Sequence, residues 1–315
     1  MECAKFDEFD ACADALLRWE IEAVQLDRGP FVGELIQARS PAALLSEMTF
    51  GRALHQRGEP PRGMRTLGVP ADPTQRIFFQ NHWAHGNQLL FFPRGGELDS
   101  VSLAGFHVFS VSYDEDRVSA ICQALAGTDY DELLAGRGVV DCSPGALQSV
   151  RRVIHQFISS SARHEDAEAQ SDSVHRDRGL DLIQTIVEVL TLDEDPRSPE
   201  PFRVRERAVR RSLDLIDASN REPLSVVDLC RAAGVSRRTL EYAFQERFGL
   251  SPKAYMLTRR LGEVRAELRQ DHVGQSITRI ASQWGFHHLS RFAAFYRRQF
   301  GELPSETIRA GRSSA

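Results

Sequence analysis

The chain has only two lysines, Lys5 and Lys253, among its 39 basic residues, so arginine carries nearly all of its positive charge. It also has no run near the ~20 consecutive apolar residues that a membrane-spanning helix needs, which argues against an integral membrane protein. The N-terminus carries acids where a secretory signal would carry bases before an apolar stretch. We therefore expect no export and a cytoplasmic location.

Cysteine is scarce, and its spacing does not fit a zinc module. None of the five cysteines forms a CxxC pair, and the odd count leaves at least one thiol unpaired. This usage favours a reduced compartment. No glycine-rich phosphate loop is present, and the order of residues shows no Ser/His/Asp or Cys/His arrangement. The sequence therefore predicts no catalytic residue and no cofactor.

The charge that is present is divided unevenly along the 315 residues. Residues 203–315 hold 21 Lys and Arg against 12 Asp and Glu, a net charge of +9. Residues 1–202 hold 18 against 32, a net charge of −14. A basic third on an acidic body indicates that one part of the chain binds a polyanion. Arginine suits forked contacts to phosphates and to guanine edges.

A domain boundary is expected at residues 193–202. Prolines and a cluster of acids follow the apolar segment 180–190, and proline disfavours helix in the residue before it. The sequence therefore predicts one domain in residues 1–192, a linker in 193–202 and a second domain in 203–315.

Residues 30–113 predict a small antiparallel barrel or sandwich of the cupin-like kind. Short apolar or alternating segments are separated there by Gly, Pro and Asn. These segments are Phe31–Ala38, Arg76–Gln80, Gln88–Phe92, Leu98–Leu103 and Phe106–Tyr113. In the last segment Phe109, Val111 and Tyr113 fall on one face of the strand, and Val108 falls on the other.

Helical periodicity follows this β-rich region. Apolar residues recur at a period near 3.6 in Val118–Ala126, Leu147–Ser159 and Leu180–Leu192, and a polar connection is expected at 160–172. The stripe of Leu182, Ile186 and Val189 in the third helix fits either a core or a dimer contact. The fold class is thus α+β, with helices added to the β-rich domain and an all-α C-terminal domain.

The C-terminal domain contains two helix-turn-helix patterns, and Leu224–Gly249 is the first. Ser225 is placed to cap a helix, with Asp228 at the capping-box position. Gly234 follows, where the chain must turn. Ser236 then caps a second helix, and Arg237 lies in its first turn. The buried side of the first helix is expected from Val226, Leu229, Ala232 and Ala233, and that of the second from Leu240, Phe244 and Phe248.

The second pattern is Ser276–Gly301, in which Ser276 caps the first helix, Gly285 turns the chain and Phe286 fills the corner. Its second helix exposes four residues at its start, which are Leu289, Ser290, Arg291 and Ala294. Between the two patterns, Ser251 and Pro252 begin a long helix that reaches Arg269. A further helix, Arg203–Ala218, opens the domain.

The sequence and spacing of both patterns resemble the AraC/XylS family of bacterial transcription regulators, over roughly residues 220–308. The most specific part is Gly285–Glu306, GFHHLSRFAAFYRRQFGELPSE. Within that family the sequence is most similar to the ethanolamine-utilisation regulator group. The shared motifs are Val235–Leu240, Trp284–Phe286, His288-Leu289 and, more weakly, Arg94–Leu98.

This resemblance implies a sequence-specific DNA-binding regulator, most often an activator, that acts with RNA polymerase on double-stranded promoter DNA. It implies that the first domain senses a small-molecule effector, dimerises, or does both. Carried over by position, the base-reading residues are Arg238, Glu241, Tyr242, Leu289, Ser290 and Arg291. The residues placed for DNA phosphates are Arg210, Arg211, Ser236, Arg237, Arg247, Arg297 and Arg298.

Two other functions stay open at this point. The first domain could serve only for dimerisation or for binding a protein partner, with no effector. A metal-dependent cupin enzyme fused to a DNA-binding module is the other alternative. His82 and His85 form an HxxH pair, and His55 and His107 lie elsewhere in the β-rich region. No acid follows at a familiar cupin spacing, so we predict no metal.

Overall fold

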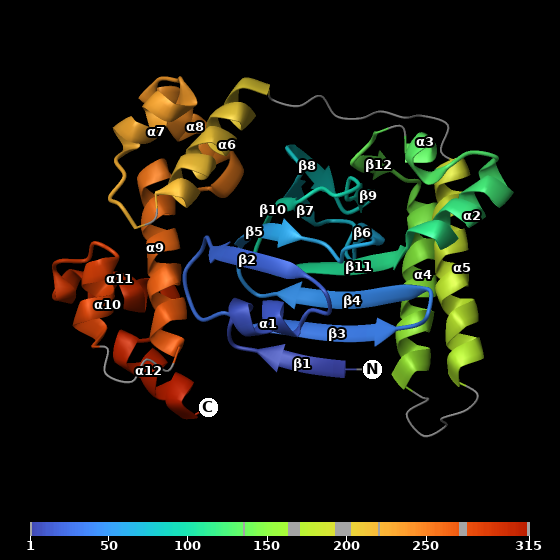
Figure 1. Ribbon diagram of the computed structural model, residues 1–315, viewed down its shortest axis with the longest axis horizontal. Helices are drawn as coiled ribbons and strands as arrows, with labels where there is room; N and C mark the ends of the chain where they lie inside the picture. Colours follow the sequence, from blue (N-terminus) through green and yellow to red (C-terminus); the bar gives the residue numbers. More distant parts are fainter. Residues whose placement is uncertain are drawn as a thin grey trace. The chain divides into compact units, whose positions relative to one another are not determined.

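The computed structural model describes residues 2–134, 136–162, 171–192, 203–219, 221–270 and 276–313. The chain divides into two compact units. The first unit comprises Met1–Glu22, Val32–Gly51 and Gln56–Glu200, and the second comprises Ala23–Phe31, Arg52–His55 and Pro201–Ala315. The linker expected at 193–202 lies outside the described residues. Figure 1 shows the β-rich first part of the chain and the helical C-terminal part that the α+β prediction requires.

The β-rich part is built from two sheets. The larger has seven strands in the order β1-β3-β4-β11-β6-β9-β12, and every neighbouring pair in it is antiparallel. Its strands are β1 (Glu2–Phe6), β3 (Gly33–Arg39), β4 (Ala43–Phe50), β6 (Met64–Pro70), β9 (Gln88–Phe91), β11 (Phe106–Asp114) and β12 (Val139–Asp141).

The smaller sheet has five strands in the order β2-β5-β10-β7-β8. They are β2 (Glu20–Gln25), β5 (Leu54–Glu59), β7 (Arg76–Phe79), β8 (His82–His85) and β10 (Leu98–Ser102). Two short helices, α1 (Phe9–Ala15) and α3 (Tyr130–Leu134), accompany the sheets.

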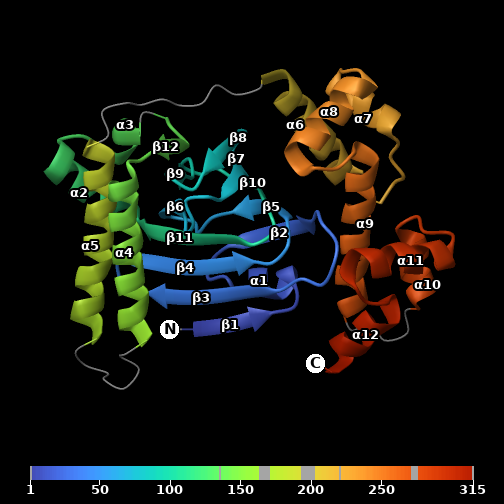
Figure 2. The same cartoon turned by 180° about the vertical axis from the view of Figure 1, so that it is seen from behind.

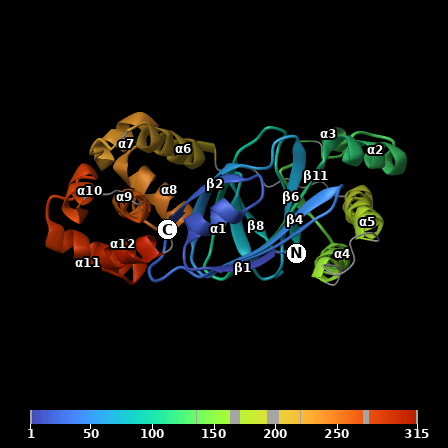
Figure 3. The same ribbon diagram turned by 60° about the horizontal axis from the view of Figure 1, so that its bottom comes forward.

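The central strand β11 shows how the larger sheet is covered. Side chains alternate between the faces of a strand, and Phe109, Val111 and Tyr113 join a buried core with three helices. The helices are α2 (Glu115–Ala126), α4 (Pro144–Ala162) and α5 (Ser171–Leu192). Figure 3 shows α4 and α5 side by side next to the sheet. The predicted face of β11 is confirmed.

Helix α5 packs inside the first unit. Leu182, Ile186 and Val189 are all buried in the same core as the sheet, so core packing accounts for the apolar stripe. The polar connection expected at 160–172 is shorter than predicted, because α4 runs to Ala162 and α5 begins at Ser171. Residues 163–170 of that connection lie outside the described residues.

All five predicted strands are present, with ends shifted by one or two residues, but seven strands had no clear signal. Among the missed strands, β4 and β6 are central to the larger sheet. In β4, buried and half-buried positions do not alternate cleanly with polar ones. In β6, six consecutive residues are buried because both faces of the strand are covered.

The helical part of the second unit is arranged along one helix. Its helices are α6 (Arg203–Ala218), α7 (Val226–Ala233), α8 (Arg237–Phe248), α9 (Pro252–Arg269), α10 (Ile277–Gln283), α11 (Leu289–Phe300) and α12 (Pro304–Ser313). Figures 1 and 2 both show α6, α7 and α8 at one end of α9 and α10, α11 and α12 at its other end. Among the described helices, none combines the length and hydropathy needed to cross a membrane.

Candidate nucleic-acid interface

The first helix-turn-helix corner joins α7 to α8 through Gly234. This glycine has a φ of +69°, a left-handed conformation that costs glycine little, and its N–H donates to the carbonyl oxygen of Cys230 at 2.9 Å. At the start of α7 the Ser225 hydroxyl accepts from the N–H of Asp228, whose carboxylate accepts from the N–H of Ser225. The predicted capping box is therefore confirmed.

Helix α8 is fixed to the domain by its inner face. The hydroxyl of Ser236 accepts from the N–H of Thr239 at 3.2 Å, which caps the helix as predicted. Leu240, Phe244 and Phe248 are buried at i, i+4 and i+8. This packing fixes which side of α8 faces solvent. In α7, Leu229 and Ala233 are buried as expected, but Val226 is only half-buried and Ala232 is exposed.

The outer face of α8 carries Arg237, Arg238, Glu241 and Tyr242, and all four are exposed. The Nε of Arg237 donates to Oε1 of Glu241 at 2.9 Å, and this hydrogen bond and the carboxylate charge raise the pKa of Arg237. The Arg238 guanidinium lies over the ring of Tyr242, 5.5 Å from its centroid. Both pairs are one helical turn apart, so the four side chains are arranged together on one face.

The second corner joins α10 to α11 through Gly285 and resembles the first. The hydroxyl of Ser276 accepts from the N–H of Arg279 at 3.2 Å and caps α10. Gly285 has a φ of +79°. Phe286 is buried, and its N–H donates to the carbonyl oxygen of Ala281 at 2.9 Å. The three predicted roles at this corner are confirmed.

The outer face of α11 is more apolar than that of α8. Leu289, Ser290, Arg291 and Ala294 are exposed, and Leu289 keeps 41% of its surface accessible although it is apolar. The guanidinium of Arg291 lies 5.7 Å from the ring centroid of Phe295. Phe292, Tyr296 and Phe300 form the buried side. Phe295, next to Tyr296 in the chain, is half-buried.

Most of the residues expected at phosphates face solvent, but Arg247 does not. Arg210, Arg211, Ser236, Arg237, Arg297 and Arg298 are exposed. Only 3% of the Arg247 side chain is accessible, and its Nη1 lies 3.7 Å from the carboxylate of Glu206 on α6. A guanidinium buried to this extent does not reach a DNA phosphate. We correct that expectation, because Arg247 instead joins α8 to α6.

The histidines of the β-rich region lie in different surroundings. His82 and His85 lie at the two ends of β8, His55 is buried, and the Nε2 of His107 lies 2.7 Å from the carboxylate of Glu47. Burial lowers the pKa of His82. In the part of the chain that the structure describes, no three His, Cys, Asp or Glu side chains gather as a metal site requires.

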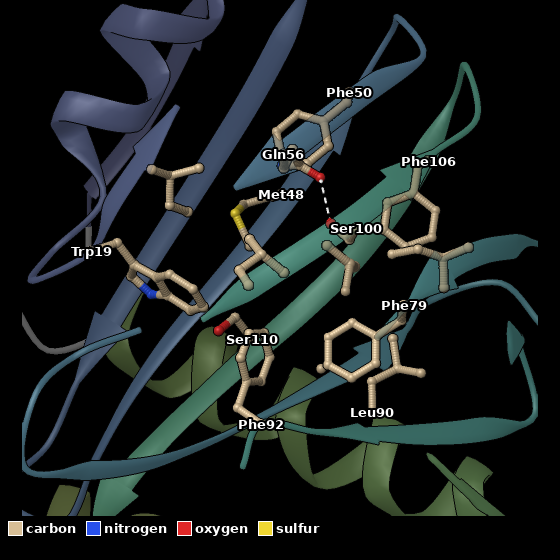
Figure 4. A pocket seen from close by; sticks show the side chains of 15 residues that line it. Trp19, Met48, Phe50, Gln56, Phe79, Leu90, Phe92, Ser100, Phe106 and Ser110 are labelled. Atoms are coloured by element: carbon tan, nitrogen blue, oxygen red, sulfur yellow. Dashed lines mark hydrogen bonds between the residues drawn. The ribbon is translucent and has the colours of Figure 1, made fainter. Parts of the chain in front are cut away.

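One site was not predicted from the sequence: a cavity in the first unit. Trp19, Gln56, Ser100 and Ser110 are among the residues that line it (Figure 4). The alternation in Phe106–Tyr113 was the available signal, because the strand face opposite Phe109 carries Val108 and the small polar Ser110. The seven unrecognised strands supply several of the other walls, so the enclosure could not be foreseen.

Comparison with known proteins matches the region that carries these corners. Residues 229–310 match the family described as a helix-turn-helix domain. The probable thc operon regulatory protein of Rhodococcus erythropolis is 36% identical over 118 residues, which cover 37% of this chain and 36% of that protein. The XylDLEGF operon transcriptional activator of Pseudomonas putida is 38% identical over 113 residues, which cover 36% of this chain and 35% of that protein.

The chain therefore spans about a third of the length of the curated relatives that it matches. Among solved structures, a Chromobacterium violaceum transcriptional regulator, described as having an AraC-type DNA-binding domain, is 32% identical. The match covers 35% of this chain and 96% of that one, with a TM-score of 0.33.

Proposed function

We propose that this chain is a sequence-specific DNA-binding transcription regulator with an AraC-type helix-turn-helix domain in its C-terminal part. The observation that carries the proposal is the exposure of the first turns of both α8 and α11, each placed after a corner with a left-handed glycine in a domain with a net positive charge. The roles follow the sequence boundaries, with sensing or dimerisation in 1–192, a linker in 193–202 and DNA binding in 203–315.

The length of α9 supports the simultaneous use of both helices. Its 18 residues correspond to about 27 Å at 1.5 Å per residue, and α8 and α11 lie near its opposite ends (Figure 2). One turn of B-DNA is about 34 Å. The two helices then enter successive major-groove segments on one face of the duplex.

Base reading is assigned to the outer faces of these helices. In α8, Arg238 contacts guanine, Glu241 accepts from cytosine and Tyr242 supports Arg238. In α11, Leu289 packs on a thymine methyl group, and Ser290 and Arg291 make the polar contacts. The two half-sites are therefore read by different chemistry.

Affinity that is independent of sequence comes from phosphate contacts. The residues proposed to make these phosphate contacts are Arg210, Arg211, Ser236, Arg237, Arg297 and Arg298. Each cation that neutralises a phosphate releases a counterion, so this part of the affinity falls with salt. Arg247 has no part in it.

The remaining assignments follow the family resemblance. We propose that the protein is an activator that works in the cytoplasm with RNA polymerase and dimerises with a second copy of the chain. We also propose that it belongs to the ethanolamine-utilisation regulator group, because it shares the motifs Val235–Leu240 and Trp284–Phe286. The cavity in the first unit supports a small-molecule effector, which would shift the population between arrangements of the two domains. No chemical step is assigned to the chain.

Selection of binding sites by the full-length protein from a random duplex library tests this function. The expected result is an enriched site with two conserved blocks about one helical turn apart, and footprinting that protects both blocks on one face. Enrichment of a single block contradicts the two-helix geometry. The absence of any enriched sequence overturns the proposed function.

A further inference from the structure

A cavity lies between the two sheets of the first unit (Figure 4). Phe106, Val108 and Ser110 of β11 face it, whereas Phe109 and Val111, which alternate with them, face the helices. The cavity volume is about 50 Å³, more than the ~10–15 Å³ that a single water molecule needs.

The space exists because three positions that face it carry small residues. Gly68 of β6 is paired directly with Ser110 of β11, and Ser100 faces the cavity from β10. Most of the other lining side chains are bulky and apolar. Figure 4 shows the rings of Trp19 and Phe92 around the same space. Protein interiors are otherwise packed as densely as organic crystals, so this space can accept a small molecule without displacing the core.

The walls of the cavity carry no charge. None of the fifteen residues that line it, all of which the structure describes, has an acidic or basic side chain. A carboxylate or an ammonium group placed there would lose its hydration and gain no counter-charge. Burial of an unpaired ion costs far more than burial of a neutral polar group. The lining therefore selects against charged molecules.

Two polar groups of the cavity wall can form hydrogen bonds with a neutral ligand. The Ser100 hydroxyl donates to Oε1 of Gln56 at 3.4 Å, which is long for such a bond (Figure 4). Among the residues that the structure describes, no hydrogen-bond partner is recorded for the amide nitrogen of Gln56 or the hydroxyl of Ser110. Both residues are buried and line the cavity, so a ligand inside it can use their unused hydrogen bonds.

We infer that this cavity binds an uncharged, largely apolar small molecule with one amide-, carbonyl- or hydroxyl-type group that meets Gln56 or Ser110. The inference rests on the proposed sensing role of the first unit, and it names the chemical class of the effector. It excludes free carboxylic acids and amines, which are ionised at neutral pH, as tight ligands of this site.

Matched pairs of probes test the role of charge. The full-length protein is titrated by calorimetry at pH 7.5 with 1-naphthamide and with 1-naphthoate, which differ in charge but hardly in shape. Octanamide and octanoate provide the same comparison for a linear chain. At least one amide is expected to bind, and at least tenfold more tightly than its acid. Equal or tighter binding of the acids, or no binding of either amide, overturns the inference.

Variants then place the probe in the cavity. Ser110→Leu adds apolar bulk where the structure has space and is expected to weaken amide binding at least tenfold. Ser149→Leu makes the same change at a half-buried position of α4 that does not line the cavity and should leave binding unchanged. Gln56→Leu keeps the approximate shape of the wall, so it tests the polar contact even if Ser110→Leu does not fold. Amide binding that neither cavity variant alters overturns the site.

Binding of the enriched DNA site is measured on the same preparations. Normal DNA binding without selectivity for neutral probes overturns this inference and leaves the proposed function standing. Selective probe binding by a protein that binds no DNA overturns the proposed function and leaves the cavity chemistry standing.

Discussion

The guanidinium of Arg238 lies over the aromatic ring of Tyr242, 5.5 Å from the ring centroid, and both side chains are exposed on α8. A cation over an aromatic face is attracted by the ring quadrupole. The contact restricts an otherwise flexible side chain, and Arg238 is thereby held toward the proposed DNA face before it meets a base.

Replacement of Arg238 by alanine should remove one base contact. We expect Arg238→Ala to cost about 1–3 kcal/mol on the selected site and to relax discrimination at one base pair. Tyr242→Phe keeps the ring and should have a smaller effect. Fluorescence anisotropy on selected and random duplexes measures both, with Arg152→Ala on α4 as a control for loss of an exposed arginine. Equal losses on both duplexes would show that Arg238 reads no base.

Arg298 and Arg247 should respond in opposite ways. Arg298 is exposed near the end of α11, so Arg298→Ala should weaken all duplexes alike and lower the salt slope of binding by about one. Arg247→Met should leave that slope unchanged, because this guanidinium is buried beside Glu206. Its loss removes a cationic neighbour from a largely buried carboxylate and should destabilise the domain on the order of 3 kcal/mol. Salt titrations and urea unfolding separate the two outcomes.

Substitution of Gly234 tests the corner itself. An added Cβ would meet only Nη1 of Arg211 at 3.8 Å, which is ordinary contact, so the cost comes from the left-handed backbone. We expect Gly234→Ala to lower the free energy of unfolding by about 1–2 kcal/mol. Gly262→Ala is the matched control, because this residue lies inside α9 with open space around it. It should stabilise the protein by about 0.5–1 kcal/mol. Equal changes in the free energy of unfolding for the two substitutions would show that the left-handed backbone at Gly234 adds no cost for alanine.

The capping box should make the start of α7 sensitive to acid. Hydrogen bonds from the hydroxyl and then the N–H of Ser225 hold the pKa of Asp228 below its usual range. A carboxyl whose pKa is lower in the folded state stabilises that state above its unfolded pKa of about 3.9, and this contribution is lost as the pH falls through the folded pKa. The difference in melting temperature between the protein and Asp228→Asn should therefore be larger at pH 7 than at pH 3.5. A constant difference would show that the charge of Asp228 has no role in the cap.

Local signals explain why the C-terminal helices were predictable. Ser225, Ser236, Ser251 and Ser276 each cap the helix that the sequence assigned to them. A cap involves atoms within about four residues of each other, so the signal and its effect lie in the same stretch of chain. Helix α6 has the bounds expected for the helix that opens the domain.

The sequence by itself determined the two glycine corners, the helices on either side of them and the outward faces of α8 and α11, because these features depend on neighbours along the chain. Only the tertiary structure decided that Arg247 is buried against α6 and that Gly68, Ser100 and Ser110 enclose one cavity. Those features depend on residues far apart in sequence, and a face of a strand or helix becomes an interior only when another element covers it.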